Sequence, residues 1–498
     1  MPEEKSAVEM AAGAVAEKGP EVSQFEQFLE KDIKTAGTRD AVRAEVQTLA
    51  EWALKYTTVV SEDALRSIEA IKAQIDKLLT EQVNAILHHA EFQKLEGAWR
   101  GLSHLVNNTE TDEKLKIRVM NISKKDLGKT LERFAGTAWD QSPIFKEIYN
   151  TGYGVLGGEP YGCLVGDYHF DHGPQDVALL GEMGKVSAAA HAPFITGAAP
   201  SLFGFGSWQE LSNPRALAKI QSTPEHASWR SLRESEDSRY LGLAMPRFLS
   251  RLPYGAKTSP VDEFAFEEDT ASAAHDKYTW ANSAYAMAVN INRSFKETGW
   301  CSQIRGVENG GGVEGLPVHT FPTDDGGVDM KCPTEIAIDD RREKELADLG
   351  MMPVLHRKNS DIAVFIAAQS LQKPTEYQDA AATANARLSA NLPYLFATCR
   401  FAHYLKVMVR DKVGSFKERS DMETWLNNWI MQFVLANPTG KTDIEKARRP
   451  LKEAKVVVEE VEGNPGFYSS TFYLMPHYQL EGLTVSLRLV SQMPSGKK

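Results

Sequence analysis

The segment YGCLVGDYHFDHGPQDVALLGEMGKVSAAAHAPFITGAA, residues 161–199, carries the clearest structural pattern in the chain. An apolar run from Cys163 to Val165 leads into polar residues. Pro174 then stands where a helix would begin, a position at which no backbone N–H is needed. Apolar and small residues recur at helical spacing up to Pro193, and residues 194–196 form a second apolar run. Strand, helix and strand in this order predict a right-handed βαβ unit with parallel strands, which is typical of the α/β class.

Acidic and imidazole side chains follow the first of these strands: Asp167, His169, Asp171 and His172. Because α/β proteins often place ligands after a strand, this set could bind a metal or perform the acid–base chemistry of a hydrolase. In the alternative, structural interpretation, Asp167 and His169 share one face of the strand and Asp171 caps the following helix. The structural interpretation is favoured, since a metal site needs three or four ligands that meet in space and the sequence offers no second cluster.

The composition is that of a large acidic protein. Its 498 residues correspond to about three domains, or to two elaborated ones, and 42% hydrophobic residues suffice for a sizeable core. A net charge of −11 argues against nucleic acid as the main partner. Four scattered cysteines favour a reducing compartment, and neither a membrane span nor a signal peptide is recognisable. We therefore expect a cytoplasmic protein without direct membrane insertion and without a metal or other cofactor.

The first 37 residues are expected to form a flexible leader with one short amphipathic helix, whose apolar side chains repeat at helical spacing: Val22, Phe25, Phe28, Leu29 and Ile33. A helix of about three turns is marginal in isolation, so its apolar face is expected to fill a groove in this protein or in a partner. A helix at 38–55 precedes a β-favouring run that needs a strand edge, within the chain or in another subunit: Thr57, Thr58, Val59 and Val60.

The middle of the chain mixes helices and strands. Helical periodicity from Leu65 to Val106 predicts two helices separated near His88 and His89, and the two imidazoles are interpreted as a junction surface rather than as metal ligands. Strands are expected at 115–120, 240–246 and 362–367, and helices at 280–296, 339–349, 383–412 and 421–435. The glycine-rich segment 306–315 lacks the GxxxxGK(S/T) pattern and contains two glutamates, so it is interpreted as a connecting loop rather than a phosphate site.

The C-terminal segment changes to β-type alternation. Strands are expected at 454–461, 467–475 and 483–490, with a turn at 464–466. A meander of this size is marginally stable in isolation, and its edges can accept a strand from another chain. A guest strand would add several backbone hydrogen bonds of roughly 0.5–1.5 kcal/mol each, which is enough for a firm link.

Six long stretches resemble one known family. They are HHAEFQKLEGAWRGLSHLVNNTETDEKLKIRVMNISKKDL (88–127), GCLVGDYHFDHGPQDV (162–177), SWQELSNPR (207–215), SLRESEDSRYLGLAMPRFLSRLPYGAKT (231–258), VEGLPVHTFPTDDGGVDMKCPTEIAI (313–338) and EEVEGNPGFYSSTFYLMPHYQLEGLTVSLRLVS (459–491). Through these stretches, which are spread over nearly the whole chain after its N-terminal segment, the sequence resembles the large subunit of the contractile sheath of the bacterial type VI secretion system, the VipB/TssC family.

The resemblance implies a structural machine part and not an enzyme. Members of this family pair with a small sheath subunit, and these heterodimers stack with neighbouring copies into a helical tube around an inner tube of hexameric rings, in contact with a baseplate. Contraction of the metastable tube drives the inner tube out of the cell. A hexameric AAA+ unfoldase then recognises an N-terminal helix of the large subunit and disassembles the sheath. Neighbouring subunits are linked by exchanged β-strands.

By position and pattern, the resemblance implies a role for each segment described above. The helix that contains Phe25 and Phe28 would bind the unfoldase, and residues 57–60 would be the strand that is donated to a neighbour. The accepting strands would contain Phe467, Phe472, Tyr473, Leu474, Val485, Leu487 and Leu489.

The expected organisation is a multi-domain α/β (α+β) chain. It consists of the leader (1–37), a helical arm with the linker strand (38–61), a body of two interleaved subdomains (62–453) and a C-terminal strand-exchange meander (454–498). The body would hold a mixed sheet core in which the βαβ unit is flanked by helices. The metal-dependent hydrolase is the alternative.

Overall fold

The computed structural model describes residues 37–38, 40–42, 44, 48, 64–155, 157–213, 216–270, 275–322, 325–412, 419–460 and 468–477. Contacts divide the chain into two units: Met1–Ile86 with Pro260–Glu268, and Leu87–Ser259 with Asp269–Lys498. Several predicted segments lie outside the described residues: the amphipathic helix with Val22, Phe25, Phe28, Leu29 and Ile33, the linker strand with Thr57, Thr58, Val59 and Val60, and the C-terminal residues Phe467, Val485, Leu487 and Leu489. The predicted domain boundaries stay predictions.

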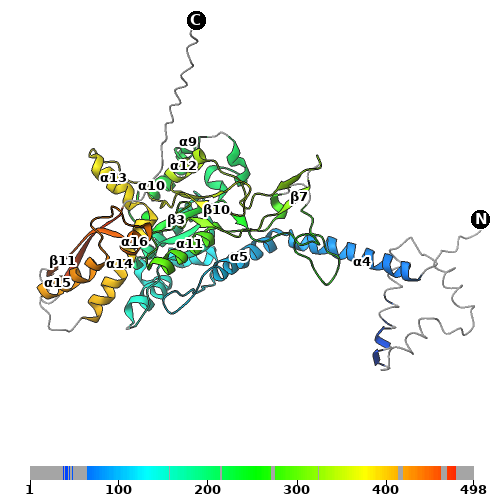
Figure 1. Ribbon diagram of the computed structural model, residues 1–498, viewed down its shortest axis with the longest axis horizontal. Coiled ribbons are helices and arrows are strands. Elements are labelled where there is room, and N and C mark those ends of the chain that lie inside the picture. Colours follow the sequence, from blue (N-terminus) through cyan, green and yellow to red (C-terminus); the bar gives the residue numbers. More distant parts are fainter. Residues whose placement is uncertain are drawn as a thin grey trace, which may run out of the picture. The chain divides into compact units, whose positions relative to one another are not determined.

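Helix α4 (Ala64–Leu87) is the long described element of the first unit (Figure 1). Asn84 Nδ2 donates a hydrogen bond to the Glu267 carbonyl oxygen at 3.2 Å, which ties the segment Pro260–Glu268 to this helix. In the second unit, α5 spans Ala90–Asn107. The predicted pair of helices with a break at His88 and His89 is therefore confirmed.

A six-stranded mixed sheet forms the centre of the second unit (Figure 1). Its spatial order is β1 (Leu164–Phe170), β2 (Phe194–Ala198), β3 (Leu241–Met245), β9 (Met351–His356), β10 (Ala363–Phe365) and β6 (Gly312–Val313). The first four strands are parallel, whereas β10 is antiparallel to both β9 and β6. Helix α8 (Pro174–Ala190) connects β1 to β2, and Pro174 lies in its first turn, so the predicted βαβ unit and mixed sheet are confirmed.

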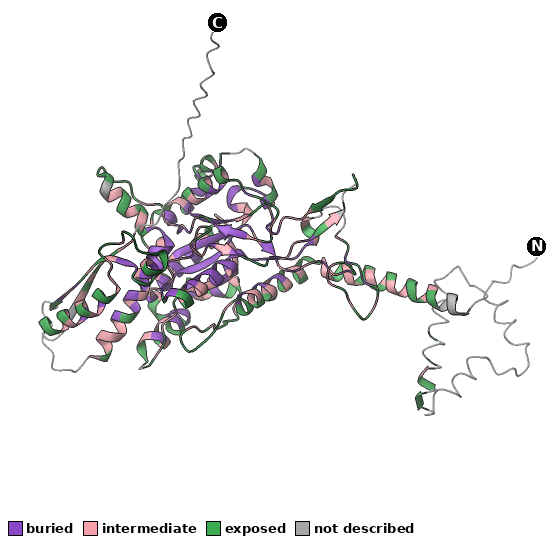
Figure 2. Ribbon diagram, viewed as in Figure 1, coloured by how far each residue is buried: buried purple, intermediate pink, exposed green. Residues whose placement is uncertain are grey.

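Helices cover both faces of this sheet, and the buried residues gather around it (Figure 2). On one face, α8, α6 (Lys124–Arg133) and α10 (Ala227–Glu234) form a core with Phe194 and Leu243. On the other, α11 (Ser283–Thr298) and α14 (Leu392–Asp411) form a core with Ile195 and Ala244. Successive residues of a strand thus enter different cores, because side chains alternate across a sheet.

A separate two-stranded sheet consists of β11 (Leu451–Glu460) and the antiparallel β12 (Tyr468–Pro476). Both strands confirm the prediction, while the third predicted strand at 483–490 lies outside the described residues. The hairpin packs against α14 and α15 (Arg419–Ile430) through an apolar core of its own, which includes Trp300, Phe401, Leu426, Ile430, Val456 and Val458. This contact is what stabilises it, since a two-stranded sheet is marginal in water.

Shorter elements connect these parts. They are η1 (Gly136–Gln141), α7 (Pro143–Phe145), the π-helix η2 (Lys146–Gly154), η3 (Pro200–Phe203), η4 (Trp208–Ser212), α9 (Leu217–Gln221), η5 (Pro224–His226), η6 (Asp237–Tyr240), β4 (Phe248–Leu249), η7 (His275–Lys277), β5 (Trp280–Ala281), β7 (Thr320–Pro322), β8 (Val328–Met330), α12 (Asp340–Asp348), α13 (Ala380–Ser389), η8 (Met431–Phe433) and α16 (Asp443–Arg448). Of the helices in the described ranges, none is both long and apolar enough to cross a lipid bilayer.

Two of the element predictions are wrong. Residues 115–120 form no strand, and Val119 and Met120 are 67% and 50% exposed. Their alternation indicates an extended, half-buried segment, but a strand also needs a neighbouring edge, which the pattern does not report. The single helix predicted at 383–412 is two helices, because α13 ends at Ser389 and α14 begins at Leu392, with Pro393 in its first turn.

Two glycines allow α5 to lie close to its neighbours in the second unit. A Cβ atom on Gly97 would lie 2.4 Å from the Trp280 carbonyl oxygen, and one on Gly101 would lie 2.4 Å from the Tyr285 ring. Both glycines are buried. The absence of a side chain at these positions therefore allows α5 to lie close to both β5 and the first turn of α11.

We predict that Gly97→Ala lowers the free energy of unfolding by about 1–3 kcal/mol, because the methyl group would overlap a backbone oxygen that has little freedom to move. The matched control is Gly128→Ala in α6, where the nearest atom to a new Cβ is 4.0 Å away. There the gain in helix propensity should leave stability unchanged or raise it by up to about 1 kcal/mol. Urea unfolding followed by circular dichroism measures both, and equal effects would contradict the close approach.

Candidate functional site

Strand β1 places Asp167 and His169 on the same face of the sheet, as predicted. The Asp167 carboxylate accepts hydrogen bonds from Asn282 and Tyr285. His169 Cδ2 and the Asn282 side chain both border the space next to Gly197. Burial raises the pKa of Asp167, although the two hydrogen bonds act in the opposite direction. Burial lowers the pKa of His169 to about 4, so its imidazole is neutral at pH 7.

Asp171 and His172 contact other parts of the chain. Asp171 accepts hydrogen bonds from the Gly173 backbone N–H at 2.7 Å and from Ser201 Oγ at 3.1 Å. His172 stacks on His226, with 4.1 Å between the ring centroids. The prediction that Asp171 caps α8 is wrong, because the N-cap residue is Gly173. Asp171 instead stabilises the turn that precedes the helix.

These four residues do not converge on one point. In the ranges that the structure describes, no group of three or more His, Cys, Asp or Glu side chains is arranged to hold a metal ion. Asp167 and His169 lie toward α11, whereas Asp171 and His172 pack on η3 and η5. The geometry thus lends no support to the metal-dependent hydrolase.

The glycine-rich segment 306–315 is a loop up to Gly311 and then enters the central sheet as β6 (Gly312–Val313). The Gly306 N–H donates to the Phe365 carbonyl oxygen at 2.7 Å, and the Phe365 N–H donates to the Gly311 carbonyl oxygen at 2.9 Å. Arg293 Nη2 donates to the carbonyl oxygens of Gly310 and Gly312. A phosphate cradle offers its backbone N–H groups to the ligand, whereas here the Gly306 N–H binds β10. The predicted connecting loop is therefore found only over residues 306–311, and the prediction missed the short strand β6 that follows it.

Two carboxylates without a local signal in the sequence hold the loops around β4 and β5: Glu335, which is buried, and Glu96, which is partly buried. Glu335 accepts hydrogen bonds from Arg247 Nη2 at 2.6 Å and from His275 Nε2 at 3.2 Å. Burial acts to raise the pKa of Glu335, but these contacts outweigh it and hold the pKa at about 2. Glu96 similarly accepts from Arg251 Nε at 2.6 Å. The partners are 88 and 155 residues apart, so no local pattern could have revealed them.

The C-terminal hairpin presents a strand edge. Among the described residues, β12 pairs with β11 and with no other strand. Phe472 and Leu474 pack on the apolar core beneath the hairpin, whereas Tyr473 is 60% exposed on the opposite side. Of the predicted accepting residues that the structure describes, Phe472 and Leu474 are partly buried against this core and Tyr473 lies on the surface.

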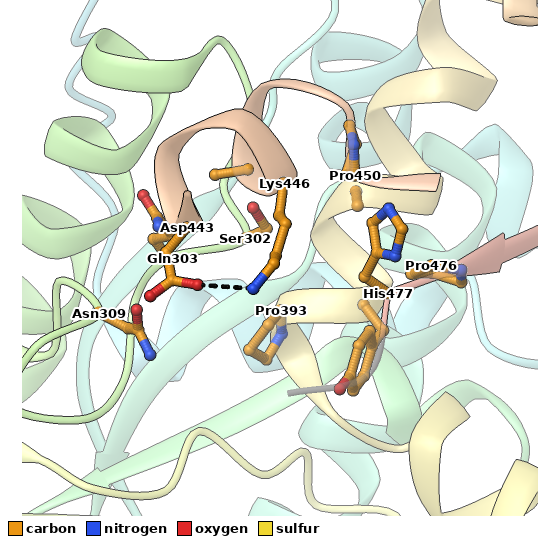
Figure 3. A pocket seen from close by; sticks show the side chains of 12 residues that line it. Ser302, Gln303, Asn309, Pro393, Asp443, Lys446, Pro450, Pro476 and His477 are labelled. Carbon is orange, nitrogen blue, oxygen red and sulfur yellow. Dashed lines mark hydrogen bonds and ion pairs between the residues drawn. The ribbon is translucent and has the colours of Figure 1, made fainter. Parts of the chain in front are cut away.

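A cavity of about 310 Å³ lies where the hairpin joins the body (Figure 3). An ion pair of 3.0 Å between Lys446 and Asp443 forms part of its wall, and the His477 N–H anchors the end of the hairpin by donating to the Pro450 carbonyl oxygen at 2.9 Å. Burial lowers the pKa of His477. The lining residues are Ser302, Gln303, Asn309, Pro393, Tyr394, Ala397, Asp443, Lys446, Ala447, Pro450, Pro476 and His477. This mixture of prolines, amides and a paired lysine defines no reaction chemistry.

Comparison with protein families assigns the chain to a class of assembly proteins, the contractile tail sheaths. The EvpB/VC_A0108 tail sheath N-terminal domain model matches residues 69–372, and the EvpB/VC_A0108 tail sheath gpW/gp25-like domain model matches residues 381–493. A curated relative, the type VI secretion system sheath protein TssC1 of Pseudomonas aeruginosa, is 68% identical over 480 residues, which is 96% of each chain. The chain therefore belongs to the VipB family of type VI secretion sheath proteins.

Two solved structures are more distant. A chain of the anti-feeding prophage baseplate matches with a TM-score of 0.34 and 10% identity, over 64% of this chain and 65% of that one. A chain of the contracted anti-feeding prophage sheath matches with a TM-score of 0.27 and 12% identity, over 63% of this chain and 66% of that one. These matches are too weak to support further conclusions.

We predict that His169→Gln makes stability less sensitive to acid. An ordinary histidine pKa is 6.5, whereas that of the folded chain's His169 is about 4. Between these values the unfolded chain binds a proton that the folded chain does not, so the folded state loses stability as the pH falls. This one residue should account for about 2 kcal/mol of the loss between pH 7 and pH 5. Urea unfolding of both proteins at pH 7 and pH 5 measures this loss. The same pH dependence in the variant and in the unaltered protein would contradict a buried neutral imidazole.

Proposed function

We propose that this chain is the large, non-enzymatic subunit of a type VI secretion contractile sheath. It pairs with the small sheath subunit and with neighbouring copies of itself, and it polymerises in the cytoplasm into a helical tube on a baseplate. The tube surrounds a second tube of hexameric rings and ejects it by contracting. The observation that carries this proposal is the 68% identity to TssC1 over 96% of both chains, since so much shared sequence leaves little room for a different architecture.

The hairpin supports strand exchange as the link between subunits. It has β11 anchored on the body and an edge strand, β12, with no second strand neighbour among the described residues. We propose that residues 57–60 of an adjacent copy and a strand of the small subunit join this sheet together with residues 483–490. Each added strand contributes several main-chain hydrogen bonds of roughly 0.5–1.5 kcal/mol. Such a link persists while the bodies rotate against each other.

Helix α5 supports the pairing with other subunits. Leu95 and Trp99 on this helix are 55% and 66% exposed, although both are large and apolar. Neighbouring exposed apolar side chains are typical of a surface that another protein covers. Contacts of this kind between bodies can differ between an extended and a contracted tube. They would then store free energy in an interface that has two stable arrangements.

The N-terminal amphipathic segment is the proposed binding site for the AAA+ unfoldase. We predict that Phe25→Ala combined with Phe28→Ala leaves tube assembly unchanged but abolishes disassembly, because the apolar face that fills the unfoldase groove is lost. Sedimentation of contracted sheaths with unfoldase and ATP measures this. The control is Glu26→Ala with Glu30→Ala, which alters the same segment away from its apolar positions. Normal disassembly of the Phe variant would contradict the assignment.

Electron microscopy tests the proposed function. The chain is expressed by itself and together with its cognate small sheath subunit, and both samples are purified identically. We expect tubes in the co-expressed sample and none in the other, because two components are needed to complete the lattice. Discrete soluble particles in both samples would contradict a polymerising sheath subunit.

A further inference from the structure

We propose that Asn427 and Glu423 of α15 block the outer edge of β11, so that the hairpin can be extended only along β12, where residues 483–490 of the same chain form the next strand. Strands from neighbouring subunits then join beyond 483–490. This inference rests on the proposed sheath function, because it specifies which edge of the hairpin carries the inter-subunit links.

The Asn427 side chain binds β11 as a neighbouring strand would. Its Nδ2 donates to the Val456 carbonyl oxygen at 2.8 Å, and its Oδ1 accepts from the Val456 N–H at 2.9 Å. A carboxamide has the same donor and acceptor as a peptide group, so it satisfies both backbone groups of one residue. Nδ2 also donates to the Glu423 carbonyl oxygen at 2.9 Å, which fixes its orientation. One turn earlier in α15, Glu423 Oε2 accepts from the Val458 N–H at 3.2 Å.

The pairing register of the hairpin shows which backbone groups of β12 point to its outer edge. Val456 lies opposite Phe472, and Ala454 lies opposite Leu474. Because the Val456 N–H and C=O point to Asn427, they point away from β12, and Val456 and Phe472 form a non-hydrogen-bonded pair. In such a pair the backbone groups of both residues point outward, and the pattern repeats every second residue. Phe472 and Leu474 therefore direct their N–H and C=O groups toward the outer edge of β12.

The two edges of the hairpin thus differ in what a guest strand must displace. On β11 it would have to remove three hydrogen bonds, from Asn427 and Glu423, and move α15 off its apolar contact with the hairpin. On β12 a guest strand would displace no other strand, because among the described residues β12 pairs only with β11, although α14 also packs against it. Covering one edge is also a common protection against wrong pairing.

The chain itself supplies the strand that fits β12. The described hairpin ends at His477, one residue after β12, and residues 478–498 follow. Residues 483–490 alternate between apolar and mostly polar side chains. The link 477–482 is long enough for the chain to reverse direction and run antiparallel along β12. Val485, Leu487 and Leu489 would then extend the apolar face that Phe472 and Leu474 begin, and Ser486 would share the outer face with Tyr473.

Disulfide formation in double-cysteine variants tests which edge is used. Lys455 lies directly opposite Tyr473, and both are exposed. One variant combines Tyr473→Cys with Ser486→Cys, and the matched variant combines Lys455→Cys with Ser486→Cys. Each is also made with Arg488→Cys in place of Ser486→Cys, to allow for a shift of register. Adjacent strands are about 4.8 Å apart and second neighbours about 10 Å apart. Only the former distance lies below the limit of about 7 Å between Cα atoms of a disulfide.

We expect a disulfide within one chain between position 473 and position 486 or 488, and none that involves position 455, in the full chain bound to its small subunit. Peptide mass analysis after mild oxidation identifies the bond. A bond to position 455, a bond between two chains in place of one within a chain, or no bond in any variant would overturn the proposal. Tubes are counted in the same samples. Tubes together with a bond to position 455 would refute this inference but leave the sheath function standing. The expected bond without any tubes would refute the sheath function but leave this inference standing.

A second measurement addresses the blocking contact. Asn427→Ala removes both hydrogen bonds to Val456, and we expect hydrogen exchange of the peptide that contains Val456 to accelerate at least tenfold. The matched control is Asn428→Ala, the next residue of α15, which is exposed. Equal exchange in the two variants would overturn the role of Asn427.

Discussion

The backbone N–H and C=O groups at the edges of a strand need hydrogen-bond partners. This requirement determines how the C-terminal hairpin packs and how it can pair with strands of other subunits. In the C-terminal hairpin, β11 is occupied on one side by β12 and on the other by side chains of α15. The outer edge of β12 has no strand neighbour among the described residues. An unpaired strand edge promotes aggregation of a monomer, whereas in an assembly the same edge can pair with a strand of another subunit. The chain belongs to the type VI secretion sheath family, and we propose that this edge joins subunits in such a sheath.

The body of the second unit provides a firm base for this hairpin. Helices on both faces of the mixed sheet enclose two apolar cores, and a third lies beneath the hairpin. Close-packed protein interiors deform little, so we expect the body to transmit force as a rigid unit. The partly buried contacts of Glu335 with Arg247 and of Glu96 with Arg251 hold the loops around β4 and β5. A sheath subunit needs such rigidity, because contraction must change the interfaces and not the body.

Local patterns in the sequence predicted helices and strands, but they did not reveal contacts between residues that lie far apart in the chain. The apolar runs around Pro174 predicted β1, α8 and β2, and alternation predicted β11 and β12. The strand predicted at 115–120 failed because alternation does not report whether an edge is available. Arg247 and Glu335 lie 88 positions apart in the chain, and Asn427 and Val456 lie 29 positions apart. Neither contact has a local signature in the sequence. The family resemblance rests on long matching stretches and needed no knowledge of these contacts.

Cryo-electron microscopy of tubes assembled from this chain and its cognate small subunit would show whether the outer edge of β12 joins neighbouring subunits. The map should resolve the sheet around the hairpin in the assembled state. We expect the sheet to continue outward from β12 through residues 483–490 to strands of neighbouring subunits, with Asn427 still bound to Val456. A guest strand paired to β11, or subunits held together without any shared sheet, would show that the outer edge of β12 does not link the subunits.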